Sequence, residues 1–327
     1  MAHKVLVSTR FFDPDTEAFL RGSGCEVVRT GLPDDVQDDA LDGAALARLL
    51  DGAAGWIVGT VPVTRGLMRA HPGLKVIARR GVGYNNVDVE AARALGRIVT
   101  IAPGGNEASV ADHAVGMMLT LAKRLHEGHL AMQNGRWTPL VSSELFEKTV
   151  GLIGFGRIAR AVARRLHGFD ARILAYDPAP DQAAAAAAGT EFVDLPTLLA
   201  QSDHVSLHLP LTPATHHLID ADTIARMKPG AIVINTSRGG LIDEPALLAA
   251  LQSGRLGGAG LDVFEEEANP VGRPDILKLL ALPNVIGTAH GAGSSNEGLV
   301  RTNRIAARTV VDVLAGRRPA PPCVVVG

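Results

Sequence analysis

Short apolar runs alternate with stretches of helical periodicity along the first hundred residues. The apolar runs predict strands at residues 4–9, 26–28, 56–59, 75–79 and 98–102. The stretches between them predict helices at residues 15–20, 44–50, 64–70 and 88–95. Regular alternation of this kind is typical of a parallel sheet that helices cover on both faces. We therefore expect an α/β domain in this part of the chain.

The middle of the chain carries the clearest pattern, a strand, a glycine turn, a helix and a second strand. Val150–Ile153 predicts the first buried strand, and Gly154 and Gly156 form the turn. The helical stretch places Ile158 with other apolar residues on one face, and the second strand ends at Asp177. This order is that of a dinucleotide-binding unit, although a plain crossover with glycines for packing has the same outline.

Each residue type in this unit suits a dinucleotide. Gly154 allows a sharp turn out of the strand, and Gly156 lets the backbone approach a pyrophosphate closely. The helix that starts there points free N–H groups at the phosphates. Asp177 is expected to accept hydrogen bonds from the adenosine ribose and to repel a 2′-phosphate. No Lys or Arg stands at residues 178–181 to hold such a phosphate, so we expect NAD rather than NADP.

Further elements follow on both sides of this unit. Pro103–Gly105 marks a boundary, and residues 108–125 predict one long apolar helix that suits a hinge, a dimer contact or ordinary packing. The later apolar runs predict strands at residues 204–209, 231–235, 258–263 and 285–287, and helices at 243–251 and 297–314. The Pro-rich tail from Arg317 to Gly327 has no predicted place.

Composition and charge narrow the class of protein. A chain of 327 residues is long enough for two domains. A net charge of −2 argues against a partner nucleic acid or membrane surface, and no apolar run is long enough to span a membrane. The start of the chain enters a strand directly, without a signal-peptide pattern. Cys25 and Cys323 form no redox or metal motif, and the histidines have no carboxylate or thiol at ligand spacing. We expect a cytoplasmic protein without a metal site.

Polar residues follow several of the later strands. Arg238 comes directly after the strand AIVIN, Asp262 ends GAGLD, and Glu267 stands in the loop behind it. His290 follows the last strand of this region. The carboxyl ends of parallel strands meet at one edge of a sheet, so these residues are expected to open beside the Gly154–Gly156 turn.

With these residues in place, the chain resembles the D-isomer-specific 2-hydroxyacid dehydrogenase family. The resemblance runs through most of the chain in the family's order, in the stretches GVGYNNVDVEAA (81–92), NEASVADHA (106–114), VGLIGFGRIARAVA (150–163), LPLTPATHHLI (209–219), MKPGAIVINTSRGGLIDEPAL (227–247), GAGLDVFEEE (258–267) and NVIGTAHGAGSS (284–295). It implies two doubly wound parallel-sheet domains with an active-site cleft between them. The first is a flavodoxin-like substrate domain of residues 1–102 with 288–327, and the second is a Rossmann NAD-binding domain of residues 103–287.

The resemblance also assigns roles by position. Arg238, Glu267 and His290 match the family's catalytic residues, and Val82, Gly83 and Arg238 match its substrate-binding positions. The positions that match cofactor contacts, together with the two turn glycines, are Gly154, Gly156, Arg157, Ile158, Asp177, Thr236, Ser237, Arg238, Asp262, His290 and Gly293.

These residue types fit the reduction of a 2-oxo acid by hydride transfer. Histidine supplies a proton to the carbonyl oxygen near neutral pH and accepts one in the reverse reaction. A carboxylate such as Glu267 favours the imidazolium form and fixes the ring. A guanidinium such as Arg238 pairs with the substrate carboxylate and polarises the ketone.

The substrate stays open among several acids. Phosphoglycerate dehydrogenases often carry an arginine where this chain reads Gly59-Thr60-Val61-Pro62, which favours a small acid such as glyoxylate or hydroxypyruvate over 3-phosphoglycerate. Formate dehydrogenases carry Gln in place of Glu267, which argues against formate, whereas phosphite dehydrogenases share the Arg–Glu–His set. An NAD-sensing protein similar to the corepressors of this superfamily is the alternative from another class. The resemblance also suggests a homodimer.

Overall fold

The computed structural model describes residues 2–32, 36, 40–265, 267 and 274–327. The chain divides into two compact units, which we describe separately. Unit 1 consists of Met1–Glu107 with Gly293–Gly327, and unit 2 of Ala108–Ala292. The boundaries expected from the sequence, after residues 102 and 287, fall a few residues earlier. The assignment of substrate and NAD binding to separate domains stays a prediction.

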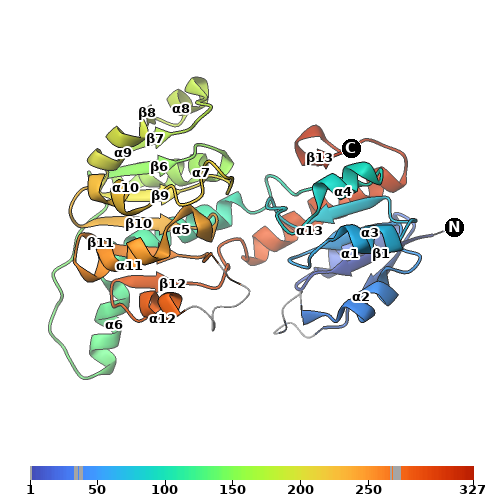
Figure 1. Ribbon diagram of the computed structural model, residues 1–327, viewed down its shortest axis with the longest axis horizontal. Coiled ribbons are helices and arrows are strands. Elements are labelled where there is room, and N and C mark those ends of the chain that lie inside the picture. Colours follow the sequence, from blue (N-terminus) through green and yellow to red (C-terminus); the bar gives the residue numbers. More distant parts are fainter. Residues whose placement is uncertain (1, 33–35, 37–39, 266, 268–273) are drawn as a thin grey trace. The chain divides into compact units, whose positions relative to one another are not determined.

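Unit 1 is built on one sheet with the strand order β13-β5-β4-β3-β1-β2 (Figure 1). The first five strands pair in parallel in the order 2-1-3-4-5, which is the order of the flavodoxin-like domain that the family resemblance implied. The last strand pairs antiparallel with β5, so the Pro-rich tail ends as an edge strand. The strands are β1 His3–Ser8, β2 Cys25–Arg29, β3 Gly55–Val58, β4 Val76–Arg79, β5 Ile98–Thr100 and β13 Val324–Val326.

The helices of unit 1 begin at polar caps and bury one face on this sheet. Asp13, Asp42, Thr64, Asp88 and Ser295 each accept a hydrogen bond from a backbone N–H in the first turn of the helix that follows. The helices are α1 Pro14–Gly22, α2 Gly43–Leu50, α3 Arg65–Ala70, α4 Val89–Ala94 and α13 Asn296–Leu314, with a 3-10 turn at Pro321–Cys323.

Helix α13 comes from the end of the chain but belongs to the core of the N-terminal sheet. Its Ala306, Ala307 and Val310 pack in one cluster with residues of β1, β3 and β4. The side chain of Asn303, fully buried, donates to the Phe11 carbonyl and to the Asp13 carboxylate, both at 3.0 Å. These contacts join the two chain segments of unit 1.

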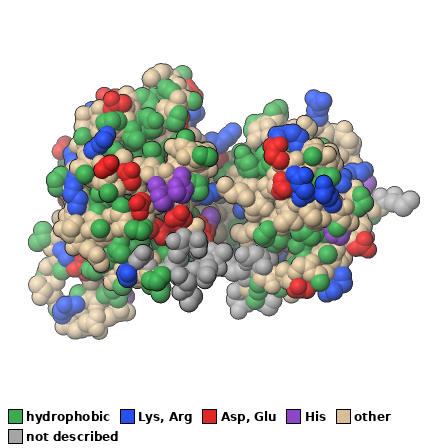
Figure 2. Space-filling model, viewed as in Figure 1, with side chains coloured by type: hydrophobic (Ala, Val, Ile, Leu, Met, Phe, Trp, Pro, Cys, Tyr) green, Lys and Arg blue, Asp and Glu red, His purple; other side chains and the backbone are tan. Residues whose placement is uncertain are grey.

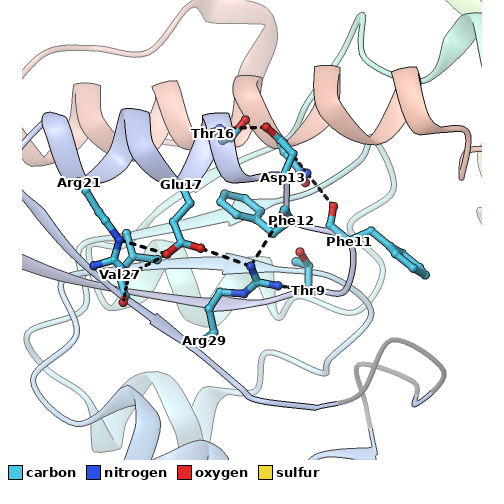
Figure 3. A network of polar contacts seen from close by, with 10 residues as sticks. Thr9, Phe11, Phe12, Asp13, Thr16, Glu17, Arg21, Val27 and Arg29 are labelled. Atoms are coloured by element: carbon cyan, nitrogen blue, oxygen red, sulfur yellow. Dashed lines mark hydrogen bonds and ion pairs between the residues drawn. The ribbon is translucent and has the colours of Figure 1, made fainter.

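A polar network fixes the loop between β1 and α1 (Figure 3). The Arg29 guanidinium donates to the Phe12 and Thr9 carbonyls at 3.3 and 3.4 Å and lies 3.5 Å from Glu17. Glu17 also accepts two hydrogen bonds from Arg21, the shorter at 2.7 Å. Because this loop receives the Asn303 side chain, the network supports the joint between the two segments.

Unit 2 is built on a parallel sheet with the order β12-β11-β10-β9-β6-β7-β8. From β6 the chain adds β7 and β8 on one side and then returns to add β9 on the other. The strand order therefore reverses between β6 and β9, where doubly wound folds bind their ligands. The strands are β6 Thr149–Ile153, β7 Arg172–Tyr176, β8 Glu191–Phe192, β9 His204–Leu207, β10 Ala231–Asn235, β11 Leu256–Leu261 and β12 Val285–Gly287.

Helices cover both faces of this sheet, and each face has its own apolar core. One core combines β9 and β10 with α9 and α11, and the other combines β6 with α5 and α7. The helices are α5 Glu107–Ala122, α6 Leu125–Gln133, α7 Arg157–Leu166, α8 Gln182–Ala187, α9 Leu195–Gln201, α10 Ala221–Arg226, α11 Glu244–Gln252 and α12 Pro274–Leu280, with 3-10 turns at His167–Phe169 and Gly239–Leu241. The predicted α/β class with two parallel-sheet domains is confirmed.

The prediction of one helix over residues 108–125 is wrong in one respect. Arg124 adopts a left-handed conformation with φ of 52°, which ends α5 and starts α6 in a new direction. Its side chain pairs with Glu127 in the first turn of α6 and donates to the Val141 carbonyl. A pattern of apolar residues does not reveal such a break, because no Gly or Pro marks it.

The distribution of charge on the surface and the length of the helices bear on possible partners. Basic and acidic side chains are interspersed on the viewed face of each unit (Figure 2). Within the described ranges, every helix is too short or too polar to cross a bilayer.

Two histidines, His204, which is buried, and His208, which is half-buried, make the stability of unit 2 depend on pH. Burial lowers the pKa of His204 in β9 and of His208 just after it from 6.5 to about 4. Between these two pH values the unfolded chain binds protons that the folded unit does not, so stability is full above pH 6.5 and is lost toward pH 4. For His204, which is 2 % exposed, the shift corresponds to roughly 3 kcal/mol.

We predict that His204→Val removes one of the two protons that the chain takes up on unfolding between pH 6.5 and about 4. Valine is β-branched and apolar, and so suits a buried strand. Urea unfolding followed by circular dichroism should show a smaller loss of unfolding free energy per pH unit, by up to about 1.4 kcal/mol, than in the wild type. His167→Asn, at an exposed histidine, should behave as the wild type does. Parallel pH profiles for His204→Val and the wild type would contradict this assignment.

Candidate active site

The turn after β6 requires glycine at its first position. Gly154 has φ of 91°, and a Cβ there would lie 2.7 Å from the His208 carbonyl oxygen. Its N–H donates to the Tyr176 carbonyl at 2.7 Å. The turn thus closes tightly over the ends of β9 and β7, at the point where the strand order reverses.

The second glycine leaves the start of α7 open. Gly156 is the N-cap of α7 and supplies no side-chain hydrogen bond, and a Cβ there would meet no protein atom within 4 Å. Gly156 and Arg157 are exposed, and Ile158 is half-buried. Backbone N–H groups at a helix start without a side-chain cap are suited to an anion. This open cradle fits the pyrophosphate of a dinucleotide.

Asp177 shapes the other end of the cradle. One carboxylate oxygen accepts from the Phe155 N–H at 2.8 Å, and the other accepts from the Ala179 N–H at 2.9 Å. The side chain is half-buried, and each oxygen keeps a further lone pair for a ribose hydroxyl. The predicted ribose contact is therefore compatible with the local hydrogen bonds.

The loop after β10 carries Arg238 and is fixed by a buried asparagine. Asn235 donates from its side-chain amide to the Arg238 carbonyl at 2.8 Å and accepts from the Ser237 N–H at 3.0 Å. The Ser237 hydroxyl donates to the Leu207 carbonyl of β9 at 2.6 Å. Thr236 is buried, and its hydroxyl has no partner among the described residues. An orphaned buried hydroxyl at this place fits a polar group of a bound cofactor.

A backbone contact holds the next loop against this one. A Cβ at Gly239 would lie 1.9 Å from the Phe264 carbonyl carbon, so the two backbones touch where Gly239 lacks a side chain. Glu267 stands three residues after Phe264. Arg238 and Glu267 therefore come from loops that pack directly on each other.

Glu267 and His290 form a close pair. The Nδ1 atom of His290 lies 2.5 Å from a carboxylate oxygen of Glu267, and the side chains are 50 % and 36 % exposed. This contact holds the Nδ1 side of the ring and leaves the Nε2 atom for another hydrogen bond. His290 has φ of 50°, a conformation that non-glycine residues adopt rarely.

Asp262 holds the loop that carries His290. It is 1 % exposed, and its carboxylate accepts from the Thr288 hydroxyl at 2.5 Å and from the Gly291 and Ala292 N–H groups at 2.8 and 3.0 Å. Its backbone carbonyl accepts from the His290 N–H at 2.8 Å. The cofactor contact expected of Asp262 stays a prediction; its carboxylate holds this loop and also lies 3.7 Å from the Nε2 atom of His113.

The electrostatics around Arg238 favour a bound anion. Burial lowers the pKa of its guanidinium from the usual value, and the negative charge of Glu267 acts in the opposite direction. One of its N–H groups donates to the Ser237 carbonyl at 2.6 Å. A cation held in a partly desolvated place binds a carboxylate more strongly than one in water.

The predicted substrate loop lies in unit 1. Val82 and Gly83 are half-buried in the turn after β4. Asn86 braces this turn, because its amide donates to the Gly59 and Val61 carbonyls and its oxygen accepts from Arg79. Gly293, the last predicted cofactor position, also belongs to unit 1, where a Cβ would lie 2.9 Å from the Asn106 side chain.

Sequence reasoning missed the residues that position the site rather than form it. Asn235 and Thr288 are two such residues, and His113 is a third, with its Nε2 atom 3.0 Å from the Thr288 hydroxyl. A polar residue at the end of an apolar strand, as in AIVIN, is the signal that could have indicated Asn235. The contact of His113 with Thr288 spans 175 positions, and no local pattern indicates it.

Comparisons with known proteins point to one family. Residues 115–292 match the model of the D-isomer specific 2-hydroxyacid dehydrogenase, NAD binding domain. A hydroxypyruvate reductase of Thermotoga maritima is 44 % identical over 237 residues, which are 72 % of this chain and 76 % of that protein. A D-3-phosphoglycerate dehydrogenase of Methanocaldococcus jannaschii is 42 % identical over 257 residues, 78 % of this chain. The match spans 48 % of that protein, so the chain covers about half the length of such relatives.

Solved structures with a similar fold include D-lactate dehydrogenases. A crystal structure of D-lactate dehydrogenase from Aquifex aeolicus, complexed with NAD and lactic acid, superposes with a TM-score of 0.83. It is 29 % identical and the superposition covers 99 % of each chain.

We predict that Gly156→Val weakens NADH binding without unfolding the protein. The position has φ of −77° and no neighbour that a side chain would strike, so the added atoms obstruct the cofactor instead. Fluorescence titration with NADH should show a loss of at least about tenfold in affinity, or 1.4 kcal/mol.

Gly168→Val, at another glycine with open space around it, serves as the matched control and should bind NADH as the wild type does. Equal affinities for Gly156→Val and the control would show that the dinucleotide lies elsewhere.

Proposed function

The chain belongs to the D-isomer-specific 2-hydroxyacid dehydrogenase family, and from this premise we propose that it interconverts a D-2-hydroxy acid and a 2-oxo acid with NAD. The observation that carries the proposal is the contact between His290 and Glu267 beside the loop of Arg238. The family assigns catalysis to residues at these positions, and in unit 2 they come together from three separate loops.

His290 is the proton donor in this proposal. Reduction requires a hydride at C2 of the 2-oxo acid and a proton at the carbonyl oxygen. The Nε2 atom of His290 gives that proton, and the Glu267 carboxylate at Nδ1 stabilises the charged ring before transfer and fixes its direction. In the reverse direction the neutral ring accepts the hydroxyl proton.

Arg238 binds and orients the acid. Its guanidinium pairs with the substrate carboxylate and draws electron density from the ketone. Asn235 and the Gly239–Phe264 contact keep the loop in place, so the guanidinium is oriented before the substrate arrives. The family resemblance also assigns Val82 and Gly83 of unit 1 to substrate binding, and this role stays a prediction.

NADH, when bound, would supply the hydride. Gly156 and the start of α7 would hold its pyrophosphate, Asp177 its adenosine ribose, and Thr236 a polar group through its orphaned hydroxyl. The Asp177 carboxylate repels a 2′-phosphate, which makes NAD the preferred cofactor over NADP.

We infer a small, unphosphorylated substrate such as glyoxylate or hydroxypyruvate, rather than 3-phosphoglycerate. Residues 59–62 carry no arginine to hold a phosphate. The nearby Arg79 and Arg80 are engaged within unit 1, where Arg79 donates to Asn86 and Arg80 to the Arg10 carbonyl. Both side chains are therefore committed to bracing their loops.

We predict that the protein oxidises NADH in the presence of glyoxylate or hydroxypyruvate. Replacing these acids with 3-phosphohydroxypyruvate, or NADH with NADPH, should give slower or no oxidation. Absorbance of the reduced cofactor measures the rates, and the same assay run with NAD and phosphite tests the phosphite-type alternative. In the reverse direction, D-acids should react and L-acids should not. Inactivity with every 2-oxo acid, together with cofactor-dependent assembly, would favour the NAD-sensing alternative.

In the same assay His290→Ala should lower kcat on the order of 100- to 10,000-fold, because the general acid is lost. His167→Ala, at an exposed histidine outside these loops, is the control. Full turnover by His290→Ala would refute this mechanism. It would not bear on the proposed NADH-binding residues.

We also propose a cytoplasmic homodimer. Cys25 and Cys323 are buried free thiols, as expected in a reducing compartment. The region of α6 and the segment after it exposes five large apolar side chains, and apolar side chains gathered in one exposed region are typical of protein–protein contacts. These are Leu125, Leu130, Met132, Trp137 and Val141, with Trp137 79 % and Val141 89 % exposed.

We predict that the double variant Trp137→Ser with Val141→Ser converts the dimer into a monomer. The apolar area that a second copy covers is the driving force, and light scattering after size-exclusion chromatography measures the mass. Leu277→Ser, at an exposed leucine of α12, is the control and should stay dimeric. A monomeric wild type would contradict the proposal.

A further inference from the structure

A second cluster of imidazole and carboxylate groups lies in unit 2, apart from His290 and Glu267. His216 Nε2 is 3.5 Å from one carboxylate oxygen of Glu265, and His217 Nε2 is 3.4 Å from the other. The candidate ligand atoms all lie within 4.8 Å of one another. In the ranges that the structure describes, no other group of three such side chains has this spacing.

The backbone turns two neighbouring histidines toward the same side. Adjacent side chains usually point apart, but His217 has φ of 51°, and the two rings stack with centroids 3.9 Å apart and planes at 26°. Backbone hydrogen bonds hold this arrangement, from the His216 N–H to the Thr212 carbonyl at 2.9 Å and from the His217 N–H to the Gly240 carbonyl at 2.8 Å. Both imidazoles are therefore presented from an anchored turn.

Glu265 comes from the neighbouring loop, whose backbone is also fixed. Its N–H donates to the buried Glu244 carboxylate at 2.7 Å, and the preceding Phe264 packs on the backbone of Gly239. The Glu265 side chain is 28 % exposed, and those of His216 and His217 are 48 % and 34 % exposed. The cluster is thus open to an ion from solvent while its backbone is fixed.

The spacing matches the edges of a small coordination polyhedron. Nitrogen and oxygen ligands lie about 2.1 Å from Zn²⁺, and two such ligands of a tetrahedral ion are about 3.4 Å apart. The two imidazole–carboxylate separations, 3.5 and 3.4 Å, are of this size. We propose that His216, His217 and Glu265 form a binding site for a divalent transition-metal ion of the zinc class.

The types of ligand indicate which metal ions this site favours. Two imidazoles and one carboxylate suit Zn²⁺ and Co²⁺, whereas Ca²⁺ and Mg²⁺ require sites made of oxygen atoms. Three protein ligands leave a tetrahedral position for water. The sequence analysis expected no metal site because it looked for partners at short spacing, and Glu265 stands 48 positions after His217.

The ion would bridge two loops that also serve the catalytic residues. The His216–His217 turn is bonded to Gly240, two residues after Arg238, and Glu265 stands two residues before Glu267. The site shares no ligand with the catalytic pair. An ion bound here stabilises the contact between the two loops without occupying the place of the substrate.

Calorimetric titration of metal-free protein with Zn²⁺ at neutral pH tests the proposal. We expect one tight equivalent per chain in the wild type and an affinity lower by more than about tenfold in His216→Ala and in Glu265→Gln, because each variant lacks one ligand. Co²⁺ should give the visible absorption of a tetrahedral site, and this absorption should be lost on acidification, since imidazole must be neutral to bind.

Two controls separate this site from other histidines. The double variant His126→Ala with His129→Ala removes a pair of exposed imidazoles on α6, and His290→Ala removes the catalytic ring. Both should keep the tight equivalent. The Glu265→Gln variant keeps the backbone hydrogen bond to Glu244, and circular dichroism checks the fold of each variant. Three results would overturn the proposal: no tight Zn²⁺ binding by the wild type, a wild-type affinity in both His216→Ala and Glu265→Gln, or the loss of tight Zn²⁺ binding in His290→Ala.

Discussion

One buried carboxylate sets the geometry on which the candidate site depends. Asp262 lies at the end of β11 and receives a hydroxyl and two backbone N–H groups from the loop of residues 288–292. Hydrogen bonds to a charged acceptor are about twice as strong as neutral ones, and a buried carboxylate without them would be very costly. The loop must therefore follow the donors that Asp262 requires. His290 takes a left-handed backbone conformation as a result, and its ring meets Glu267.

Glycine has the complementary role of permitting close approach. At Gly154 the chain turns over the end of β9, and at Gly239 one loop backbone touches another. A Cβ at either place would separate parts that the site brings together. Fixed acceptors such as Asp262 and Asn235 then determine which way the touching loops point. The reactive side chains of unit 2 consequently stand on short, braced segments at the carboxyl ends of its strands.

Much of this arrangement could be predicted from local patterns. The strand, turn and helix from Val150 onward and the terminal Asp177 follow from periodicity and glycine placement, as do most strands of both sheets. The break at Arg124, the edge strand at the C-terminus and the task of Asp262 could not be predicted in this way. A left-handed arginine has no sequence signal, and the other two depend on partners far away in the chain. The cluster of His216, His217 and Glu265 was not predicted for the same reason, since its members come from two loops that are far apart in the sequence.

The chain order of unit 1 has a consequence for how the protein is made. Residues 1–107 leave the ribosome long before α13 and β13, which supply the helix packed on β1, β3 and β4 and the strand that pairs with β5. Until α13 and β13 have been synthesised, the nascent sheet has an uncovered apolar face and an unpaired edge, both of which invite association with other chains. Unit 2 is contiguous and meets no such delay. Biosynthesis therefore favours folding of unit 2, the middle of the chain, before unit 1, whose nascent sheet a chaperone would have time to protect.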